Sequence, residues 1–111
     1  MKYSTFFLLL YAEVSSLKEA EELLQAITPQ IQAHTLFEVQ DISQYYKISE
    51  YYGINLDLYP RSDPLTTFDG LVLCGASGWT FTTEHDGVWN PQPGVVFLSP
   101  LVRWANLVLW M

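Results

Sequence analysis

The last third of the chain, from Asp69 to Met111, constrains the fold most, because it holds all four tryptophans of the sequence and its only cysteine. Within this part, Leu101 to Trp110 is apolar at almost every position. Its content of valine, leucine and tryptophan favours a strand, with one face formed by Val102, Trp104, Asn106, Val108 and Trp110. A helix with Ser99 as its N-cap and Pro100 at its first position is the alternative. A strand that is apolar on both faces belongs in the middle of a sheet.

A short strand, a hairpin and a second short extended segment are expected before this segment. Leu71 to Cys74 is a short apolar run between glycines, which is typical of a buried strand. Trp79 to Thr83 alternates apolar and polar side chains, and Val88-Trp89 resumes after Asp86-Gly87. Asp-Gly between two such runs predicts a type I′ hairpin turn. Val95 to Leu98 indicates a short strand or an extended loop.

The N-terminal part predicts a strand followed by a helix. Tyr3 to Val14 is almost continuously apolar. Ser16 and Glu19 have the spacing of a capping box, in which the hydroxyl accepts from the third helical N–H and the carboxylate reaches back. The apolar stripe of the helix comprises Leu17, Ala20, Leu23, Leu24, Ile27 and, near its end, Ile31. Pro29 is expected to end or kink this helix near Thr28.

The middle of the chain predicts two strands, with one segment between them that fits two alternatives. His34 to Gln40 and Ile54 to Leu58 have strand character. The segment Asp41 to Gly53 fits either a short helix, which Gly53 would end, or an irregular strand. Tyr59 to Thr67 contains two prolines and is expected to be a loop.

Together these elements predict a single α+β domain over residues 1–111. Its sheet is mostly antiparallel with five or six strands, the first helix packs on one face, and a second short helix is possible. A chain of 111 residues is long enough for one hydrophobic core.

The charge balance restricts the possible partners. Twelve acidic and five basic residues give a formal charge of −7, which repels nucleic acid and anionic lipid and attracts basic molecules. One cysteine cannot form an intramolecular disulfide. The apolar runs are shorter than the ~20 residues that span a bilayer, and Phe6 to Leu10 fits a first strand better than a signal peptide because Glu13 follows closely. We expect a cytoplasmic protein.

No motif for catalysis or metal binding is present. His85 lies beside Glu84 and Asp86, but no nucleophile accompanies it, so a solvated hairpin tip is the simpler interpretation. The only other histidine is His34, and neither zinc spacing nor a phosphate loop occurs. The sequence predicts no cofactor, no metal site and no enzymatic activity.

Two further polar residues lie among apolar ones. Cys74 is expected to be a small buried hydrophobe. Arg103 is expected to pair with Glu84 or Asp86, or to extend outward at a sheet edge.

Four tyrosines and one glutamate, close together in the sequence, form the first candidate binding surface. They are Tyr45, Tyr46, Glu50, Tyr51 and Tyr52. Tyrosine is enriched at interfaces because it buries a large area at small entropic cost. Alternatively, these rings cover a sheet edge and keep their hydroxyls in water.

The segments "GWTFTTEHDGVWNPQP" and "VRWANLVLW" resemble the C-terminal part of small acidic immunity proteins from bacterial toxin–immunity systems, including contact-dependent growth inhibition. The resemblance covers the last third of the chain and includes no catalytic pattern. It implies a protein inhibitor that binds one cognate toxin domain, in many such systems a basic nuclease. Nucleic acid and membrane are not expected partners, and the protein would be a monomer or a weak homodimer.

Under this hypothesis the toxin-facing surface is the tyrosine cluster with Glu50, or the set Glu84, His85, Asp86 and Trp89. Two alternatives remain open. A small-molecule-binding sensor domain would line a pocket with its aromatic rings. A structural oligomerisation module would bury them against another copy.

Overall fold

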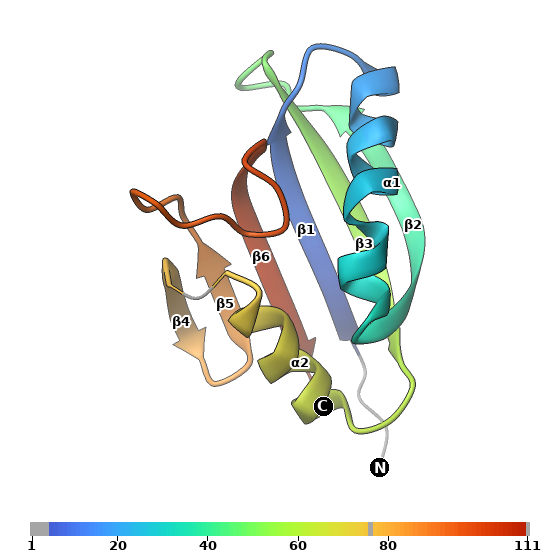
Figure 1. The fold of residues 1–111 in the computed structure, drawn as a ribbon, viewed down its shortest axis with the longest axis vertical. Helices are drawn as coiled ribbons and strands as arrows, with labels where there is room; N and C mark the ends of the chain where they lie inside the picture. The colour runs from blue at the N-terminus through green and yellow to red at the C-terminus, as the bar shows by residue number, and fades with distance from the viewer. Residues whose placement is uncertain (1–4, 76, 111) are drawn as a thin grey trace.

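The computed structural model describes residues 5–75 and 77–110, and these form two helices and one six-stranded antiparallel sheet. The elements are β1 (Thr5–Glu13), α1 (Leu17–Gln32), β2 (Thr35–Gln44), β3 (Tyr51–Pro60), α2 (Pro64–Leu73), β4 (Trp79–Thr83), β5 (Asp86–Trp89) and β6 (Val102–Trp110). The strand order is β2-β3-β1-β6-β5-β4, so the first and last strands lie side by side in the middle (Figure 1). The expected α+β class is confirmed. Tyr3 and Ser4 of the expected first strand lie outside the described residues.

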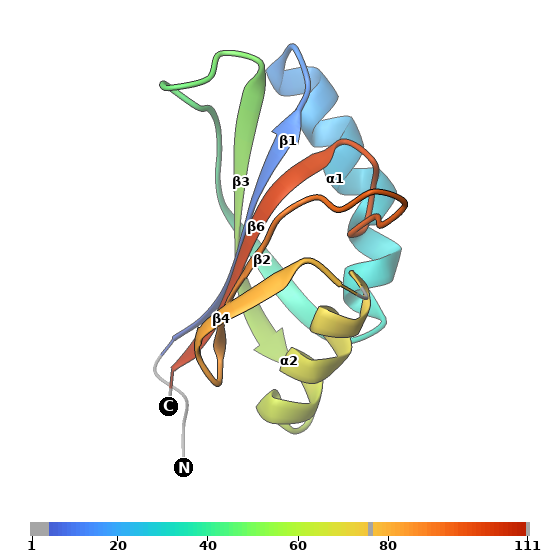
Figure 2. The same ribbon diagram turned by 90° about the vertical axis from the view of Figure 1, so that its left-hand side faces the viewer.

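Both helices lie on the same face of the sheet (Figure 2). The buried side chains of α1 pack with the even-numbered residues of β1 and with apolar residues of β3 and β6 in one core. The connection between β5 and β6 adds Phe97 and Leu98 to this core. We call this side of the sheet the covered face.

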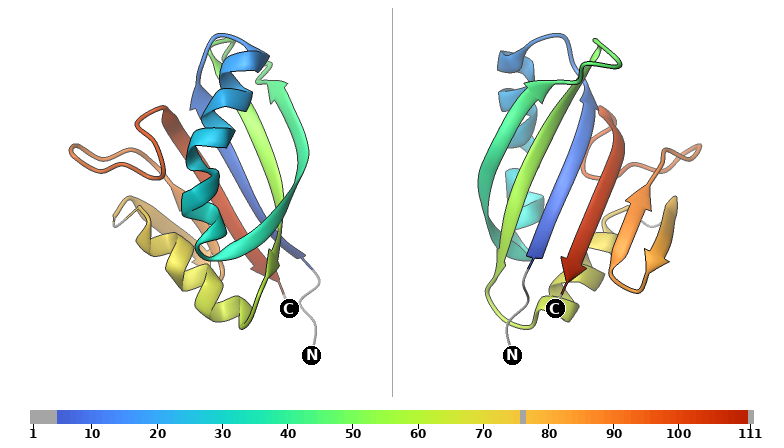
Figure 3. Two further views of the ribbon diagram at one scale, coloured as in Figure 1. Left: turned by 45° about the vertical axis from the view of Figure 1, so that its right-hand side comes forward. Right: turned by 180° about the vertical axis from the view of Figure 1, so that it is seen from behind.

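The opposite face carries neither of the two helices and is seen from the front in the right panel of Figure 3. Side chains alternate between the two faces of a strand, and the pairing register therefore places the odd-numbered residues of β1 here. Their neighbours on β6 are Trp104, Asn106, Val108 and Trp110. We call this side the open face.

Helix α1 begins as expected but does not end at its proline. The backbone N–H of Glu19 donates to Ser16 Oγ (3.1 Å). The Glu19 carboxylate accepts from the N–H and hydroxyl of Ser15 rather than from Ser16. The helix continues through Pro29 to Gln32, and Ile31 is fully buried. Burial of Ile31 compensates for the hydrogen bond that proline removes.

Helix α2 replaces two elements that were predicted differently. Leu71 to Cys74 was expected to be a strand and the residues before it a loop, but Pro64–Leu73 is a helix with Cys74 as its C-cap. Asp63 is the N-cap, and Pro64 occupies the first turn, where its missing N–H costs nothing. Among the described residues, neither helix has the length and apolarity needed to cross a membrane.

The segment Asp41 to Gly53 is a hairpin, so of its two predicted alternatives the short helix is wrong. Strand β2 continues to Gln44, and β3 begins at Tyr51. The turn is closed by the N–H of Tyr45, which donates to the carbonyl of Tyr51 (2.8 Å). Gly53 lies within β3 and is paired with Ser43 and with Tyr11 on its two sides.

The hairpin between β4 and β5 exists, but its turn lies two residues earlier than predicted. Glu84 and His85 form the turn, and Asp86 and Gly87 already belong to β5. A Cβ at position 87 would lie 2.7 Å from the Phe81 ring and 2.9 Å from the Trp79 ring. The glycine is therefore required for close approach of the aromatic rings of β4, not for a positive φ.

Residues 102–110 form a strand in the middle of the sheet, as the sequence favoured. A bulge near its start changes one expected side-chain direction. Tyr11 pairs with Trp104 and Ala12 with Val102, so Arg103 is the extra residue and Val102 faces the core.

Two glycines with positive φ provide a matched test of this packing. Gly78 has φ of 100°, and a Cβ there would lie 2.5 Å from the Asn90 carbonyl oxygen; Gly94 has φ of 76° with no neighbour within 4 Å. We expect Gly78→Ala to lower the free energy of unfolding by about 2–4 kcal/mol, through backbone strain and overpacking. Gly94→Ala should cost only about 1 kcal/mol. Urea denaturation measures both, and equal losses would contradict the close approach at Gly78.

Candidate functional site

Four aromatic rings form a continuous row across the open face, near the turn between β2 and β3. Trp104 lies 5.2 Å from Tyr11 between ring centroids, and Tyr11 stacks on Tyr45 at 4.5 Å with 22° between the ring planes. Tyr46 meets the Tyr45 ring edge-on at 5.5 Å. We call these four residues the aromatic row. Contacts of this kind hold the rings in fixed positions relative to one another.

The strand register explains why the row forms. Tyr11 of β1 and Trp104 of β6 are directly paired, and cross-strand pairs on one face have Cβ atoms about 4.5–5.5 Å apart. On its other side Tyr11 is paired with Gly53. A Cβ at Gly53 would lie 2.9 Å from the Tyr11 ring, so the glycine leaves room for the ring to lie across β3 and reach Tyr45.

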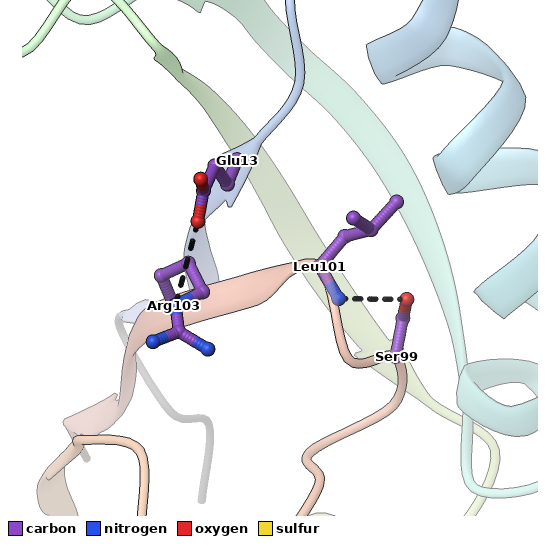
Figure 4. Close-up of polar contacts among 4 residues, drawn as sticks. All are labelled: Glu13, Ser99, Leu101 and Arg103. Carbon is purple, nitrogen blue, oxygen red and sulfur yellow. Dashed lines mark hydrogen bonds and ion pairs between the residues drawn. The ribbon is translucent and has the colours of Figure 1, made fainter.

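A first pocket, of about 420 Å³, lies on the Trp104 side of the row. It is lined by Tyr11, Tyr45, Ile48, Tyr51, Arg103 and Trp104. We call it the Arg103 pocket. Arg103 Nε lies 3.8 Å from Glu13 Oε1 (Figure 4), so the partner of this cation is Glu13 and not Glu84 or Asp86 as expected. Both side chains are exposed, so the pair orients the guanidinium and contributes little to stability.

A second pocket, of about 250 Å³, lies on the other side of Tyr11 and Tyr45. Its lining includes Leu9, Tyr11, Asp41, Tyr45, Gly53 and Asn55. We call it the Asp41 pocket. Asp41 Oδ2 accepts from the Ser43 hydroxyl at 2.8 Å. Asn55 Oδ1 is buried and has no hydrogen-bond partner among the described residues.

Several carboxylates also lie on the open face, and of these Glu13 and Asp41 are close to the aromatic row. The register places Glu13, Glu38, Asp41, Asp57 and Asp86 on this side of the sheet. Glu38 and Asp57 are directly paired across β2 and β3, and like charges in such positions are destabilising. The open face therefore combines apolar rings with five carboxylates, one of which pairs with Arg103.

The structure divides the predicted tyrosine cluster between different surfaces. Tyr45 and Tyr46 belong to the aromatic row, and Tyr46 is 85% exposed. Tyr51 lines the Arg103 pocket. Tyr52 is paired with Ala12 and faces the covered side, because neighbouring residues of a strand point in opposite directions. Glu50 lies in the turn and lines a separate pocket near the start of α1.

The second predicted set does not form one surface. Glu84 is exposed in the turn, and Asp86 Oδ1 accepts from Asn106 Nδ2 at 3.1 Å on the open face. The His85 ring packs edge-on against Phe68 of α2 at 5.3 Å, so it is not simply a solvated tip. Trp89 is only 1% exposed and donates to the Ser77 carbonyl, which excludes it from a partner-facing surface.

The two predicted sets lie near opposite ends of the sheet (Figure 1). Across the sheet, Asp86 is level with Val108 and Phe7. Tyr52, close to the turn between β2 and β3, is level with Ala12. Five residues along a strand correspond to about 17 Å. A partner that contacts both sets must cover most of the open face.

Cys74 and His34 place a thiol next to an imidazole, the pair of groups found in cysteine nucleophiles with a neighbouring base. The Sγ atom lies 3.7 Å from His34 Nε2 and donates to the Gly70 carbonyl at 3.5 Å. Cys74 is only partly buried, not fully buried as expected, and this burial raises the pKa of its thiol, which disfavours the reactive thiolate. Within residues 5–75 and 77–110, no three His, Cys, Asp or Glu side chains are grouped to hold a metal.

Among the residues of the site that sequence reasoning did not identify are Tyr11, Trp104, Asp41, Gly53 and Asn55. Tyr11 and Trp104 lie in strands that are apolar at nearly every position, so their face could not be assigned without the strand order. For Asn55 a signal was present: in residues 54–58 polar residues alternate with apolar ones, which puts Asn55 on the other face of the strand from the buried Ile54 and Leu56.

Tyr11 provides a pH-dependent test of the row. Burial, with smaller contributions from Tyr45 and Tyr46, raises the pKa of its phenol above the ordinary value of 10.0. Above pH 10 the unfolded chain therefore releases this proton before the folded chain does, and the stability from Tyr11 is lost as pH rises. We expect Tyr11→Phe to lose less unfolding free energy than the wild type between pH 8 and 10.5. Parallel losses in urea titrations would show that Tyr11 is not buried in the row.

Comparison with known proteins gives no relative for this chain: no family model, curated protein or solved structure matches it. Its function must therefore be argued from the open face and its two pockets.

Proposed function

We propose that this chain is an immunity protein that binds and neutralises a cognate bacterial toxin domain through the open face of its sheet. The observation that carries the proposal is the aromatic row on an acidic face that neither helix covers. Aromatic anchors at the centre of an interface supply most of the binding energy in many complexes. In this proposal the rings are anchors and the carboxylates are the surrounding polar contacts.

The size of the open face suits a protein partner. Strands β2, β3, β1 and β6 are adjacent and have nine or ten residues each. At strand spacings of about 4.8 Å and about 3.3 Å per residue, they cover roughly 600 Å². A standard interface buries about 800 Å² on each partner. The four long strands and the side chains at their rims come close to this area.

The charge of the face favours a basic partner. Glu38 and Asp57 lie opposite each other, and this repulsion costs folding free energy that a cationic partner would offset. The formal charge of −7 adds a long-range attraction that raises the association rate. A toxin nuclease with a basic substrate cleft has the complementary charge, and the chain would act on it in the cytoplasm of the producing cell.

A second candidate function has one specific observation in its favour. The Arg103 pocket combines four aromatic rings with a guanidinium, and such a lining suits a small aromatic carboxylate. In that case the chain would be a sensor domain. A rise in melting temperature with a metabolite pool, and none with a toxin domain, would favour this function.

The decisive experiment is protection in living cells. The domain encoded by the C-terminal end of the adjacent upstream reading frame is expressed with and without this chain. We expect that domain to stop growth when expressed alone, and growth to resume when this chain is expressed with it. The purified pair should also elute as a 1:1 complex. A toxic domain that neither binds nor is neutralised would refute the proposal, and self-association of the chain in sedimentation would favour the oligomerisation module.

Tyr46 tests whether the aromatic row is the binding surface. Its ring is 85% exposed, so Tyr46→Ala should change the free energy of unfolding by less than about 0.5 kcal/mol. We expect the variant to bind the toxin domain at least ~10-fold more weakly, as for the loss of an aromatic anchor. The matched control is Leu73→Ala, because Leu73 is 74% exposed on α2. Calorimetry that finds equal effects for both variants would remove the row from the interface.

Glu38 tests the role of negative charge. Glu38→Lys replaces a repulsion with Asp57 by an attraction, so we expect stability to rise by about 0.2–1 kcal/mol. Association with a basic toxin domain should nevertheless slow severalfold at low salt and approach the wild-type rate at high salt. Glu22→Lys, with the same change of charge on the exposed side of α1, is the control for net charge. Equal rates for the two variants in stopped-flow mixing would contradict a directed electrostatic surface.

A further inference from the structure

We propose that the Asp41 pocket is a binding site for an arginine side chain, with Asp41 and Asn55 as hydrogen-bond acceptors and Tyr45 as the aromatic wall. The inference rests on the proposed function only for the identity of the protein that presents the arginine.

The strand register brings the polar groups of the pocket together. Asp41 of β2 and Asn55 of β3 are directly paired, which places their Cβ atoms about 4.5–5.5 Å apart on the open face. On its other side Asn55 is paired with Leu9 of β1. The pocket therefore has an apolar side at Leu9 of β1. The Asp41 carboxylate of β2 and the Asn55 amide of β3 lie next to each other on its opposite side.

Asn55 supplies an acceptor that lacks a donor. Its Oδ1 is buried without a partner among the described residues, while the side chain lines the pocket. A buried acceptor without a hydrogen bond is unfavourable, and the terminal torsion of asparagine is soft. The oxygen itself is buried, so a donor that enters the pocket would satisfy it once the amide rotates toward the pocket.

The two pockets beside Tyr11 and Tyr45 carry side chains of opposite charge. A cationic ligand is therefore expected in only one of them. The Arg103 pocket already contains a guanidinium, so a second cation there would be repelled. The Asp41 pocket contains a carboxylate and, in its lining, no cationic side chain. A cation is therefore attracted to the Asp41 side of the row.

Arginine fits this pocket better than lysine. Its planar guanidinium packs well against aromatic side chains and donates in two directions at once, which suits a pocket with Tyr45 beside two adjacent acceptors. Lysine concentrates its charge at one atom and has no plane to stack. The chain's own Lys47 lies 5.6 Å from the centroid of Tyr46, at the outer end of the row, so Tyr46 already has a cation and is not assigned to the ligand.

The test is an NMR titration of the whole chain with N-acetyl-arginine amide. N-acetyl-citrulline amide has the same shape without charge and serves as the control probe. We expect the arginine probe to shift the side-chain amide signal of Asn55 and the backbone signals of Asp41 and Gly53, with a Kd of order 1–10 mM. The citrulline probe should bind at least ~5-fold more weakly. Equal binding of both probes, or shifts centred on Trp104, would overturn the assignment.

Two isosteric variants separate the site from the general negative field. Asp41→Asn should weaken the arginine probe about 3- to 10-fold, since it removes the carboxylate of the pocket. Asp57→Asn makes the same change of charge on the same face, outside the lining of the pocket, and should alter binding less than 2-fold. Equal weakening by both variants would show that only the overall charge attracts arginine.

This titration uses no toxin domain, so its outcome is separate from that of the protection experiment. If the arginine probe binds as described and no toxin domain is neutralised, the pocket stands and the immunity function fails. If a toxin domain is neutralised and the arginine probe does not bind, the immunity function stands and the pocket assignment fails.

Discussion

The structure depends on one constraint: a single sheet that has both helices on the same face. Its two middle strands, β1 and β6, are apolar on both sides, and only one side is buried by α1, α2 and the connection before β6. Because side chains alternate along a strand, half of the apolar residues must lie on the open face. Most of them are less buried there than the core residues, and Tyr11 and Trp104 shield each other by a ring contact. The same geometry that forms the core therefore produces the candidate binding surface.

Local signals predicted the elements that depend on local chemistry. The cap at Ser16, the apolar stripe of α1 from Ala20 to Ile31 and the strand at residues 102–110 were confirmed, whereas Leu17 of the predicted stripe is 48% exposed. Helix α2 was missed because Leu71 to Cys74 was interpreted without the Asp63-Pro64 pair that begins the helix. The segment that joins β2 and β3 was left between a helix and an irregular strand because Gly53 resembled the end of a helix, whereas it makes room for a ring from β1. Such long-range contacts are not visible in a window of sequence.

The candidate site was predicted only in part for the same reason. Tyr45, Tyr46 and Tyr51 were recognised from their clustering, but Tyr52 faces the covered side and Trp89 is in the core. Tyr11 and Trp104 are 93 residues apart and meet only because the first and last strands are neighbours. Strand order decides which aromatic residues meet, and neither composition nor periodicity determines that order.

The aromatic row also bears on the cost of binding. A flexible tyrosine loses rotamer freedom when a partner fixes it, and this loss reduces affinity. Tyr11 and Tyr45 are already stacked, and Trp104 is held against Tyr11 by strand pairing, so much of this loss occurs during folding. Gly53 permits the arrangement because it has no side chain where the Tyr11 ring lies. The resulting surface is preorganised at its centre, while Tyr46 remains exposed at its edge to adapt to the partner.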